Sequence, residues 1–279
     1  MSKKQAFISS ASTSGVCQKI KPAVVSICLP SANPDGSLIL NISGTGFNVD
    51  PDGLVVTCRH VVEPYVQAEN PNILQEIKES KNPVKTNVLR PSVMFYFKID
   101  EDHWAAIQKA VLNIQIDSKE DIALLSLIPG DFRPGYQKNY PFISFDSDRI
   151  LEGQEIVTVG FPLGDSLHKE FGGATYSFHF GHIGAVAPFP SKTVPPDKLQ
   201  LDILTNHGNS GGPVIKLSNG RVVGMLNLGA VIKHGEQAQI EVPTGISYAV
   251  PAWKIIENID SNKEDGKKIF PVLSEMANS

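Results

Sequence analysis

Short apolar runs, broken at close intervals by turn residues, are the feature of this sequence that most restricts its fold. The 279 residues include 23 glycines and 20 prolines, and turn sequences such as those at 50–53 and 218–220 separate the runs. Apolar runs of about four to eight residues with such boundaries are typical of β-strands. They fall into two clusters, divided near residues 130–150, which predicts two antiparallel barrels or sandwiches with a cleft between them.

Two helices are expected beside the strands. Residues 70–80 begin with a good N-cap, Asn70, followed by a proline at the first helical position. Residues 251–260 form a short amphipathic pattern. The polar, serine-containing residues 1–20 are predicted to be a flexible N-terminal segment, and 263–279 a charged tail.

The composition excludes several classes of protein. With 41% hydrophobic and 19% charged residues, the chain can bury a sizeable core and is not expected to be disordered. The net charge of −4 and the lack of a Lys/Arg-rich run argue against a nucleic-acid partner. No apolar run approaches the roughly 20 residues needed to span a bilayer.

The cysteines and the N-terminus suggest a cellular location. Cys17, Cys28 and Cys58 make an odd and sparse set, whereas a secreted protein of this length and class usually carries several paired bridges, so a reducing compartment is favoured. The first residues include lysines but no continuous apolar segment behind them, so a secretory signal is not expected. We therefore predict a cytoplasmic location, with organelle targeting left open.

The cysteines are not expected to carry chemistry. Cys28 and Cys58 lie in apolar runs, which is typical of inert core thiols. The segment Cys58-Arg59-His60 is too isolated to form a metal site. No metal and no cofactor is predicted.

Residues 207–213, His-Gly-Asn-Ser-Gly-Gly-Pro, carry the strongest chemical signal. A serine in a glycine-rich turn is common by itself, but here predicted strands lie on both sides of the turn. The backbone N–H groups of Gly208, Asn209 and Ser210 could converge on one oxygen, while the glycines after Ser210 allow close approach. Because a hydroxyl is not nucleophilic unaided, the interpretation requires a general base.

His60 and Asp121 are the candidates for the base and for the group that orients it. His60 lies between two valine-rich stretches, which would hold the imidazole at the edge of a packed core. Asp121 opens the apolar run Ile-Ala-Leu-Leu. Each residue alone has a structural alternative: His60 could be a core histidine, and Asp121 could cap the end of a strand. Together with Ser210, in the order His, Asp, Ser, they indicate nucleophilic acyl transfer, most simply peptide hydrolysis, and the order excludes an α/β-hydrolase.

At these residues the chain resembles the HtrA/Deg type of trypsin-like serine protease. The similarity covers roughly residues 22–260. The matching segments are 43–47 (Ser-Gly-Thr-Gly-Phe), 56–62 (Val-Thr-Cys-Arg-His-Val-Val, where the family usually has Thr-Ala before the residue preceding histidine), 121–127, 159–164, 199–202, 208–213 and 245–251. The resemblance implies an all-β, chymotrypsin/trypsin-like fold of two six-stranded antiparallel β-barrels with a short C-terminal helix. The protease domain would span 21–262, with the barrels at about 21–140 and 141–250 and the helix at about 251–260.

The resemblance also implies roles for individual residues. His60 would be the base, Asp121 its orienter and Ser210 the nucleophile, with the N–H groups of Gly208 and Ser210, and Asn209 as a further candidate, forming the oxyanion hole. Residues 189–197 would be a mobile loop that orders this hole. Asn227, Leu228 and Gly229 would pair with an extended substrate backbone by strand addition.

Other implications concern assembly and domain content. Family members are often trimers, so a homo-oligomer is an option, and no C-terminal PDZ domain is expected. Residues 65–90 resemble an insertion that could contact a partner. His207 stands where the family often has proline.

Leu204, six residues before Ser210, matches the position at which trypsin carries an aspartate for basic substrate side chains. An apolar residue there could not pair a buried lysine or arginine, which predicts cleavage after small or medium apolar residues. The expected function is therefore a serine endopeptidase acting on unfolded or extended protein segments. The alternative is a catalytically silent relative that binds peptides as a chaperone or regulatory module.

Overall fold

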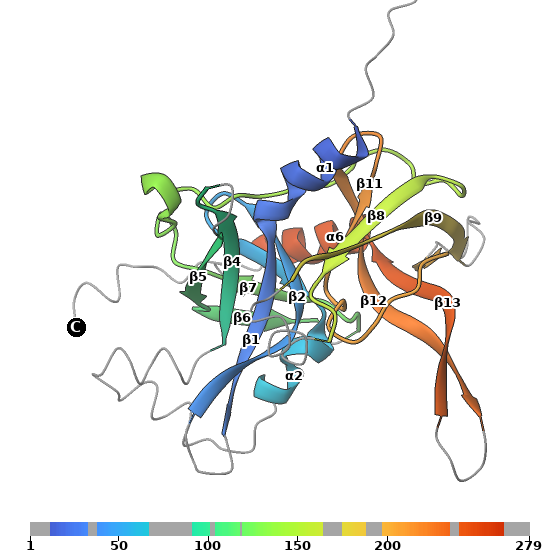
Figure 1. Cartoon of the computed structure of the whole chain (residues 1–279), viewed down its shortest axis with the longest axis horizontal. Coiled ribbons are helices and arrows are strands. Elements are labelled where there is room, and N and C mark those ends of the chain that lie inside the picture. The colour runs from blue at the N-terminus through green and yellow to red at the C-terminus, as the bar shows by residue number, and fades with distance from the viewer. Residues whose placement is uncertain are drawn as a thin grey trace, which may run out of the picture.

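The structure is a computed structural model that describes residues 12–32, 38–66, 91–100, 104–117, 119–163, 175–187, 197–234 and 240–264. Strands predominate in these ranges (Figure 1). The strands of the N-terminal half are β1 (Val24–Ala32), β2 (Leu38–Asp50), β3 (Leu54–Thr57), β4 (Ser92–Lys98), β5 (Trp104–Ala110), β6 (Asn113–Ile116) and β7 (Ala123–Ser126). Those of the C-terminal half are β8 (Glu155–Gly160), β9 (Ser177–Ala187), β10 (Lys198–Leu201), β11 (Pro213–Lys216), β12 (Arg221–His234) and β13 (Ile240–Pro251).

The helices described are few and lie at the edges of the sheets. They are α1 (Thr13–Ile20), α2 (Arg59–Val66) and α6 (Ala252–Glu264), with two single 3₁₀ turns, η1 (Lys21–Ala23) and η2 (Pro134–Tyr136). In the described ranges, none of these helices has both the length and the apolar character that crossing a membrane requires. The helix predicted for 70–80 lies outside the described residues.

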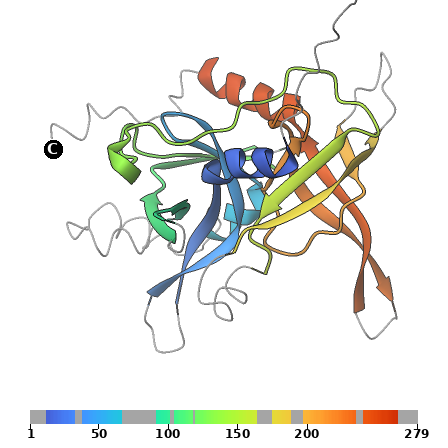
Figure 2. The ribbon, with the colours of Figure 1, turned by 45° about the horizontal axis from the view of Figure 1, so that its top comes forward.

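The strands form two antiparallel sheets. The first has the order β5-β4-β1-β2-β3-β7-β6, and the second closes into a barrel in the order β10-β13-β12-β11-β8-β9. Figures 1 and 2 show the two sheets side by side, with α1 near their junction. The predicted fold class, all-β with two antiparallel units and a C-terminal helix, is confirmed. The first sheet differs in detail, because it has seven described strands rather than six.

The buried apolar side chains form two clusters, and the larger one joins the two sheets. The barrel encloses one cluster, which includes Ile156, Leu199 and Val214, and the first sheet contributes most of a larger cluster. That larger cluster also takes in residues from the outside of the barrel and from α6, among them Met225 and Ile255. The sheets are therefore held together by apolar packing, which fixes the cleft between them.

The chain ends differ from the sequence prediction in two places. Residues 1–20 were expected to be flexible, but α1 occupies 13–20 and buries Val16, Cys17 and Ile20 on one face. The Ser12 hydroxyl caps this helix by accepting a hydrogen bond from the Gly15 N–H at 3.1 Å. The spacing 16, 17, 20 is a helical one, but it is too short to stand out in a serine-rich segment. The C-terminal helix, α6, extends to Glu264 rather than about residue 260.

Candidate active site

The register of β3 and β7 brings His60 and Asp121 together. These antiparallel strands pair Leu54 with Ser126 and Thr57 with Ala123. Continuing the same register beyond both strand ends places the chain around His60 opposite the chain around Asp121. His60 is the second residue of α2, which begins directly after β3, so its backbone and ring both face the loop before β7. Two residues that are distant in sequence thus meet at one edge of the first sheet.

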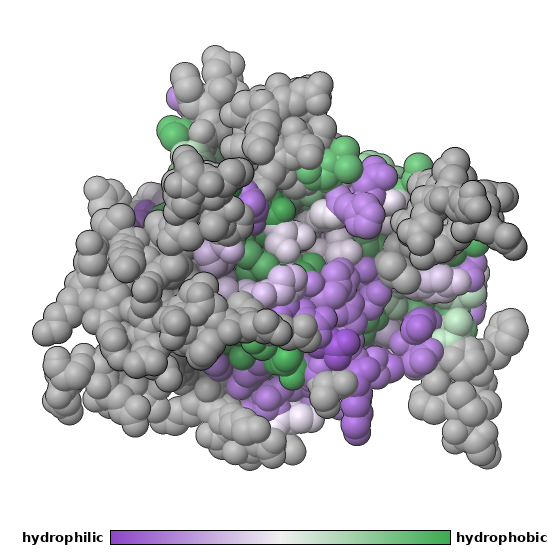
Figure 3. All heavy atoms as spheres, turned by 90° about the horizontal axis from the view of Figure 1, so that it is seen from below, coloured by the Kyte–Doolittle hydropathy of each residue, from purple (hydrophilic) through white to green (hydrophobic). Residues whose placement is uncertain are grey.

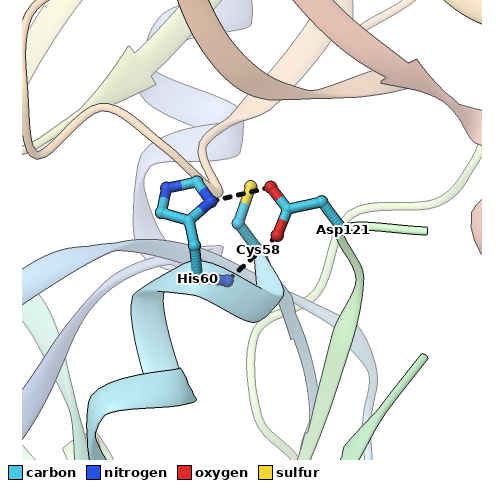
Figure 4. A group of neighbouring side chains, drawn as sticks. All are labelled: Cys58, His60 and Asp121. Atoms are coloured by element: carbon cyan, nitrogen blue, oxygen red, sulfur yellow. Dashed lines mark hydrogen bonds and ion pairs between the residues drawn. The ribbon is translucent and has the colours of Figure 1, made fainter. Parts of the chain in front are cut away.

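Asp121 holds the His60 ring through two contacts (Figure 4). Its Oδ2 lies 2.7 Å from His60 Nδ1, and its Oδ1 accepts the His60 backbone N–H at 2.9 Å. Burial raises the pKa of the Asp121 carboxyl, but the hydrogen bonds from the His60 ring and backbone, together with the charge of the imidazolium form, lower it more, so the pKa lies below its ordinary value. An ionised carboxylate can only accept hydrogen bonds, so Nδ1 carries a ring proton, and in the neutral imidazole Nε2 then presents a lone pair.

Asn227 makes a third contact to the same carboxylate. Its side-chain Nδ2 donates to Asp121 Oδ2 at 2.9 Å. The pairing of β12 with β13 shifts between Leu226 and Leu228, so Asn227 is the extra residue of a β-bulge. Bulges re-aim side chains beside active sites, and this one directs Asn227 across the cleft from the barrel to the first sheet.

Ser210 lies in the loop between β10 and β11, and this loop is bonded to the first sheet. Its backbone C=O accepts the Thr45 N–H at 3.0 Å, which ties the loop to β2 of the first sheet. The buried Thr45 hydroxyl donates to the Gly208 C=O at 2.6 Å and accepts the Phe161 N–H at 3.0 Å. Thr45 therefore connects β2, the serine loop and the end of β8.

The Ser210 hydroxyl is not hydrogen-bonded to His60 in this conformation. It donates to the Asn227 C=O at 3.0 Å, and no bond to the imidazole is present among the described residues. Asn227 therefore contacts Ser210 through its backbone and Asp121 through its side chain. Asn227 thus links Ser210 to the His60–Asp121 pair, with the Ser210 hydroxyl turned toward β12.

The backbone N–H groups of the serine loop differ in their availability. Gly208 has φ +93°, a conformation that favours glycine, and the N–H groups of Gly208 and Ser210 have no acceptor among the described residues. The Asn209 N–H, in contrast, donates to the Asn206 C=O at 3.2 Å. In this structure the Asn209 N–H closes the turn, and its role as a further oxyanion donor stays a prediction.

Gly211 is the residue of this loop with least room. Its φ is +85°, and a Cβ atom added there would lie 2.1 Å from the Thr45 backbone O and 2.4 Å from the Thr57 hydroxyl. Its N–H donates to the Leu226 C=O at 2.8 Å. Only glycine lets the loop lie this close to β2 and β3 while also bonding to β12.

We expect Gly211→Ala to lower the free energy of unfolding by about 3 kcal/mol or more, because left-handed backbone strain and overpacking each cost about 1–3 kcal/mol. Gly130→Ala is the matched control. Gly130 also has positive φ, +73°, but no atom lies within 4 Å of the added Cβ, so only the backbone cost of about 1–2 kcal/mol applies. Urea unfolding of both variants measures the difference. Equal losses would mean that the contacts with Thr45 and Thr57 relax freely.

The predicted substrate-contacting residues lie on the barrel. Leu204 is 52% exposed in the loop after β10, and Leu228 and Gly229 belong to β12, where they pair with Tyr248 and Ser247 of β13. The aspartate closest before Leu204, Asp202, accepts from the His182 N–H and lies 3.1 Å from His182 Nδ1. The loop predicted at 189–197 lies outside the described residues except for Asp197.

Two features of the site escaped the sequence interpretation. Thr45 was noted only as part of a matching segment, and Asn227 only for its backbone. Neither has a sequence signal for its side chain, because the bulge and the contact between sheets depend on packing.

Figure 3 views the molecule from the side on which α2 lies in Figure 1, and hydrophilic residues gather near the centre of that face.

Comparisons with known proteins show what this chain is similar to. The family model for the trypsin-like peptidase domain matches residues 44–225. Serine protease HTRA1B of Danio rerio is 29% identical over 241 residues, which is 86% of this chain and 39% of the relative. A probable periplasmic serine endoprotease, DegP-like, of Rickettsia prowazekii is 26% identical over 226 residues, 80% of this chain and 34% of the relative. The chain thus spans less than half the length of these curated relatives.

A solved structure shows the same fold. The HtrA-type protease AlgW with decapeptide superposes with a TM-score of 0.59 at 18% identity, covering 91% of this chain and 68% of that one.

The cytoplasmic location predicted from the sequence is wrong. The finding against it is that relatives from Rickettsia prowazekii, Rickettsia conorii and Rhizobium meliloti are named as probable periplasmic endoproteases. The cysteine count misled the prediction, because a chain with two sizeable apolar clusters does not need disulfides for stability. Its three cysteines are free and buried.

With most of the chain matched by the family model, and with these relatives, the chain belongs to the trypsin-like peptidase domain family and is of the HtrA type.

Proposed function

We propose that this protein is a serine endopeptidase that hydrolyses unfolded or extended protein segments through an acyl-enzyme. The observation that carries the proposal is the His60 ring, held by Asp121 through Nδ1, with Asn227 bonded both to Asp121 and to Ser210 on its glycine loop. This set matches the base, orienter and nucleophile that peptide hydrolysis requires.

In the proposed reaction, the Ser210 hydroxyl first turns from the Asn227 C=O to His60 Nε2. Rotation about its Cα–Cβ bond between staggered positions accomplishes this turn, and catalytic hydrogen bonds often form only once substrate is bound. His60 then takes the hydroxyl proton as the oxygen attacks the scissile carbonyl. Asp121 stabilises the imidazolium, which afterwards gives its proton to the leaving amine.

The oxyanion of the tetrahedral intermediate would bind to backbone N–H groups. Those of Gly208 and Ser210 are unpaired among the described residues, which supports this role for them. A substrate chain would lie along Asn227, Leu228 and Gly229 and add a strand beside β12. The Asn227 C=O, when Ser210 releases it, becomes free to accept a substrate N–H.

A fluorophosphonate probe tests this proposal. We expect one covalent adduct per chain, located on Ser210 by mass spectrometry of the digested protein, and we expect an unfolded protein substrate to compete for labelling. Parallel incubation with casein should release peptides. Failure to label or to cleave, at any substrate concentration, would favour the silent peptide-binding module instead.

The proposed specificity is for small or medium apolar residues before the cut. Leu204 offers no charge to a lysine or arginine side chain, and Asp202 is already paired with His182. Leaving a buried cation unpaired costs several kcal/mol, so we expect kcat/KM for Ala, Val or Leu at this position to exceed that for Arg by at least ~100-fold. A peptide library with one varied position measures this ratio, and preferential cleavage after Arg or Lys would contradict the assignment.

Trimer formation, implied by the resemblance alone, stays a prediction.

A further inference from the structure

We propose that Cys58, His60 and Asp121 form a binding site for a thiophilic divalent cation such as Zn²⁺, and that occupation of this site stops catalysis. Metal binding itself does not depend on the proposed function, whereas its inhibitory consequence does. The sequence showed only the isolated pair Cys58 and His60. The third donor, Asp121, lies in the loop before β7, 61 residues after His60, and reaches the pair only through the fold.

The geometry of the three donor atoms carries the proposal. Cys58 Sγ, His60 Nδ1 and a carboxylate oxygen of Asp121 all lie within 4.8 Å of one another. Figure 4 shows the Cys58 thiol directed toward the gap between the imidazole and the carboxylate. Donors of a tetrahedral zinc ion lie about 3.3–3.8 Å apart, given bond lengths of about 2.0–2.3 Å. Small side-chain rotations that separate Nδ1 from the carboxylate would therefore admit the ion.

The donor set is selective. Thiolate and imidazole favour zinc, cadmium and other soft or borderline cations, whereas Mg²⁺ and Ca²⁺ prefer sets made only of oxygen. Three protein ligands leave a fourth tetrahedral position for water, as in open zinc sites. Cys58 is completely buried, while the side chains of His60 and Asp121 are 45% and 20% exposed. The ion would thus enter from the solvent side, past the imidazole, with the thiol as the inner ligand.

The thiol proton must leave when the metal binds. In the free protein Cys58 Sγ lies 3.3 Å from the Leu226 C=O, with the thiol as donor. Burial raises the pKa of this thiol, and the neighbouring Asp121 charge raises it further, so the cation must displace a firmly held proton. That proton passes to solvent. The ring proton of His60 leaves Nδ1 for Nε2, because Nδ1 now binds the metal.

This shift of the ring proton explains why binding would stop catalysis. A metal-bound Nδ1 fixes the neutral imidazole with its proton on Nε2, the nitrogen that must accept the Ser210 proton. The base is thereby lost without any movement of Ser210. The ion also withdraws Asp121 from the imidazole that it orients.

Cadmium titration tests the site without relying on activity. We expect the full chain to develop one thiolate-to-Cd²⁺ charge-transfer absorption per molecule, and Cys58→Ala to lose it. Cys28→Ala is the matched control, since Cys28 is also buried (4% exposed) but lies on β1, and it should keep the absorption. Circular dichroism establishes folding of each variant, and Cys58→Ser replaces Cys58→Ala if the alanine variant unfolds. No absorption in the wild type, or an equal one in the Cys58 variant, would overturn the proposal.

Zinc inhibition tests the consequence. With each variant's rate normalised to its own value in chelator, we expect Zn²⁺ to inhibit peptide hydrolysis and Mg²⁺ not to. Cys58→Ala should raise the half-inhibitory Zn²⁺ concentration at least ~10-fold, because even the loss of a group that only supports a ligand weakens metal binding by 10- to 100-fold. Equal inhibition of wild type, Cys58→Ala and Cys28→Ala would contradict the assignment. A cadmium absorption band in a protein without hydrolytic activity would support the metal site and contradict the proposed function.

Discussion

Ser210→Ala is expected to lower kcat for peptide hydrolysis by about 10⁶-fold, the loss measured when the nucleophile of a serine protease is removed. The alanine lacks the oxygen that forms the acyl-enzyme, while the backbone of the loop is unchanged. The Ser210 C=O bond to Thr45 and the Gly211 bond to Leu226 do not involve the side chain. Only the hydroxyl contact with the Asn227 C=O is lost, so we expect unfolding to shift by no more than about 1 kcal/mol.

Burst and steady-state kinetics with an activated ester measure this loss. Ser147→Ala is the control, because Ser147 is exposed and lies in the segment before β8, and it should leave kcat within about twofold. Residual cleavage above the uncatalysed rate is expected in Ser210→Ala from backbone donors and binding. A Ser210→Ala variant that retains more than about 1% of wild-type turnover would show that another group is the nucleophile.

Much of the fold was predictable because it depends on local patterns. The strand runs and the turns with Gly and Pro predicted an all-β chain in two units, and residues 251–260 predicted the start of α6. Short β3 and β7 were visible since both are fully buried, which makes them continuous apolar runs in the sequence. Their order also placed the histidine, aspartate and serine segments correctly along the chain.

The remaining features depend on pairings that the sequence does not display. The register of β3 with β7 brings His60 to Asp121, but the sequence of neither strand indicates which strand it pairs with. The bulge at Asn227 follows from a shift in strand pairing, and the two roles of Asn227 follow from the bulge. The linking role of Thr45 could not be predicted because its hydrogen-bond partners lie in three separate segments, around Thr57, Phe161 and the serine loop. The donor set at Cys58 was missed for the same reason.

Asp121→Asn is expected to lower kcat by about 10⁴-fold, with KM little changed, as for the corresponding change in trypsin. The Asp121 carboxylate accepts three hydrogen bonds, from the His60 N–H, from His60 Nδ1 and from Asn227 Nδ2. An asparagine can accept on only one of its two terminal atoms. If its oxygen accepts the His60 backbone N–H, its NH₂ group faces Nδ1 and forces the ring proton onto Nε2, so the base is lost.

The second histidine–aspartate pair provides a close control. His182 and Asp202 repeat the arrangement, with the backbone N–H and Nδ1 of the histidine both directed to one carboxylate, but among the described residues no serine is hydrogen-bonded to either side chain. Asp202→Asn should therefore change kcat by less than about threefold. A loss below about 100-fold in Asp121→Asn, measured on the same peptide, would mean that His60 keeps its tautomer without the carboxylate. If the full loss appears, the tautomer of one imidazole controls the enzyme, and a cation on Nδ1 would inhibit by the same change that asparagine makes permanent.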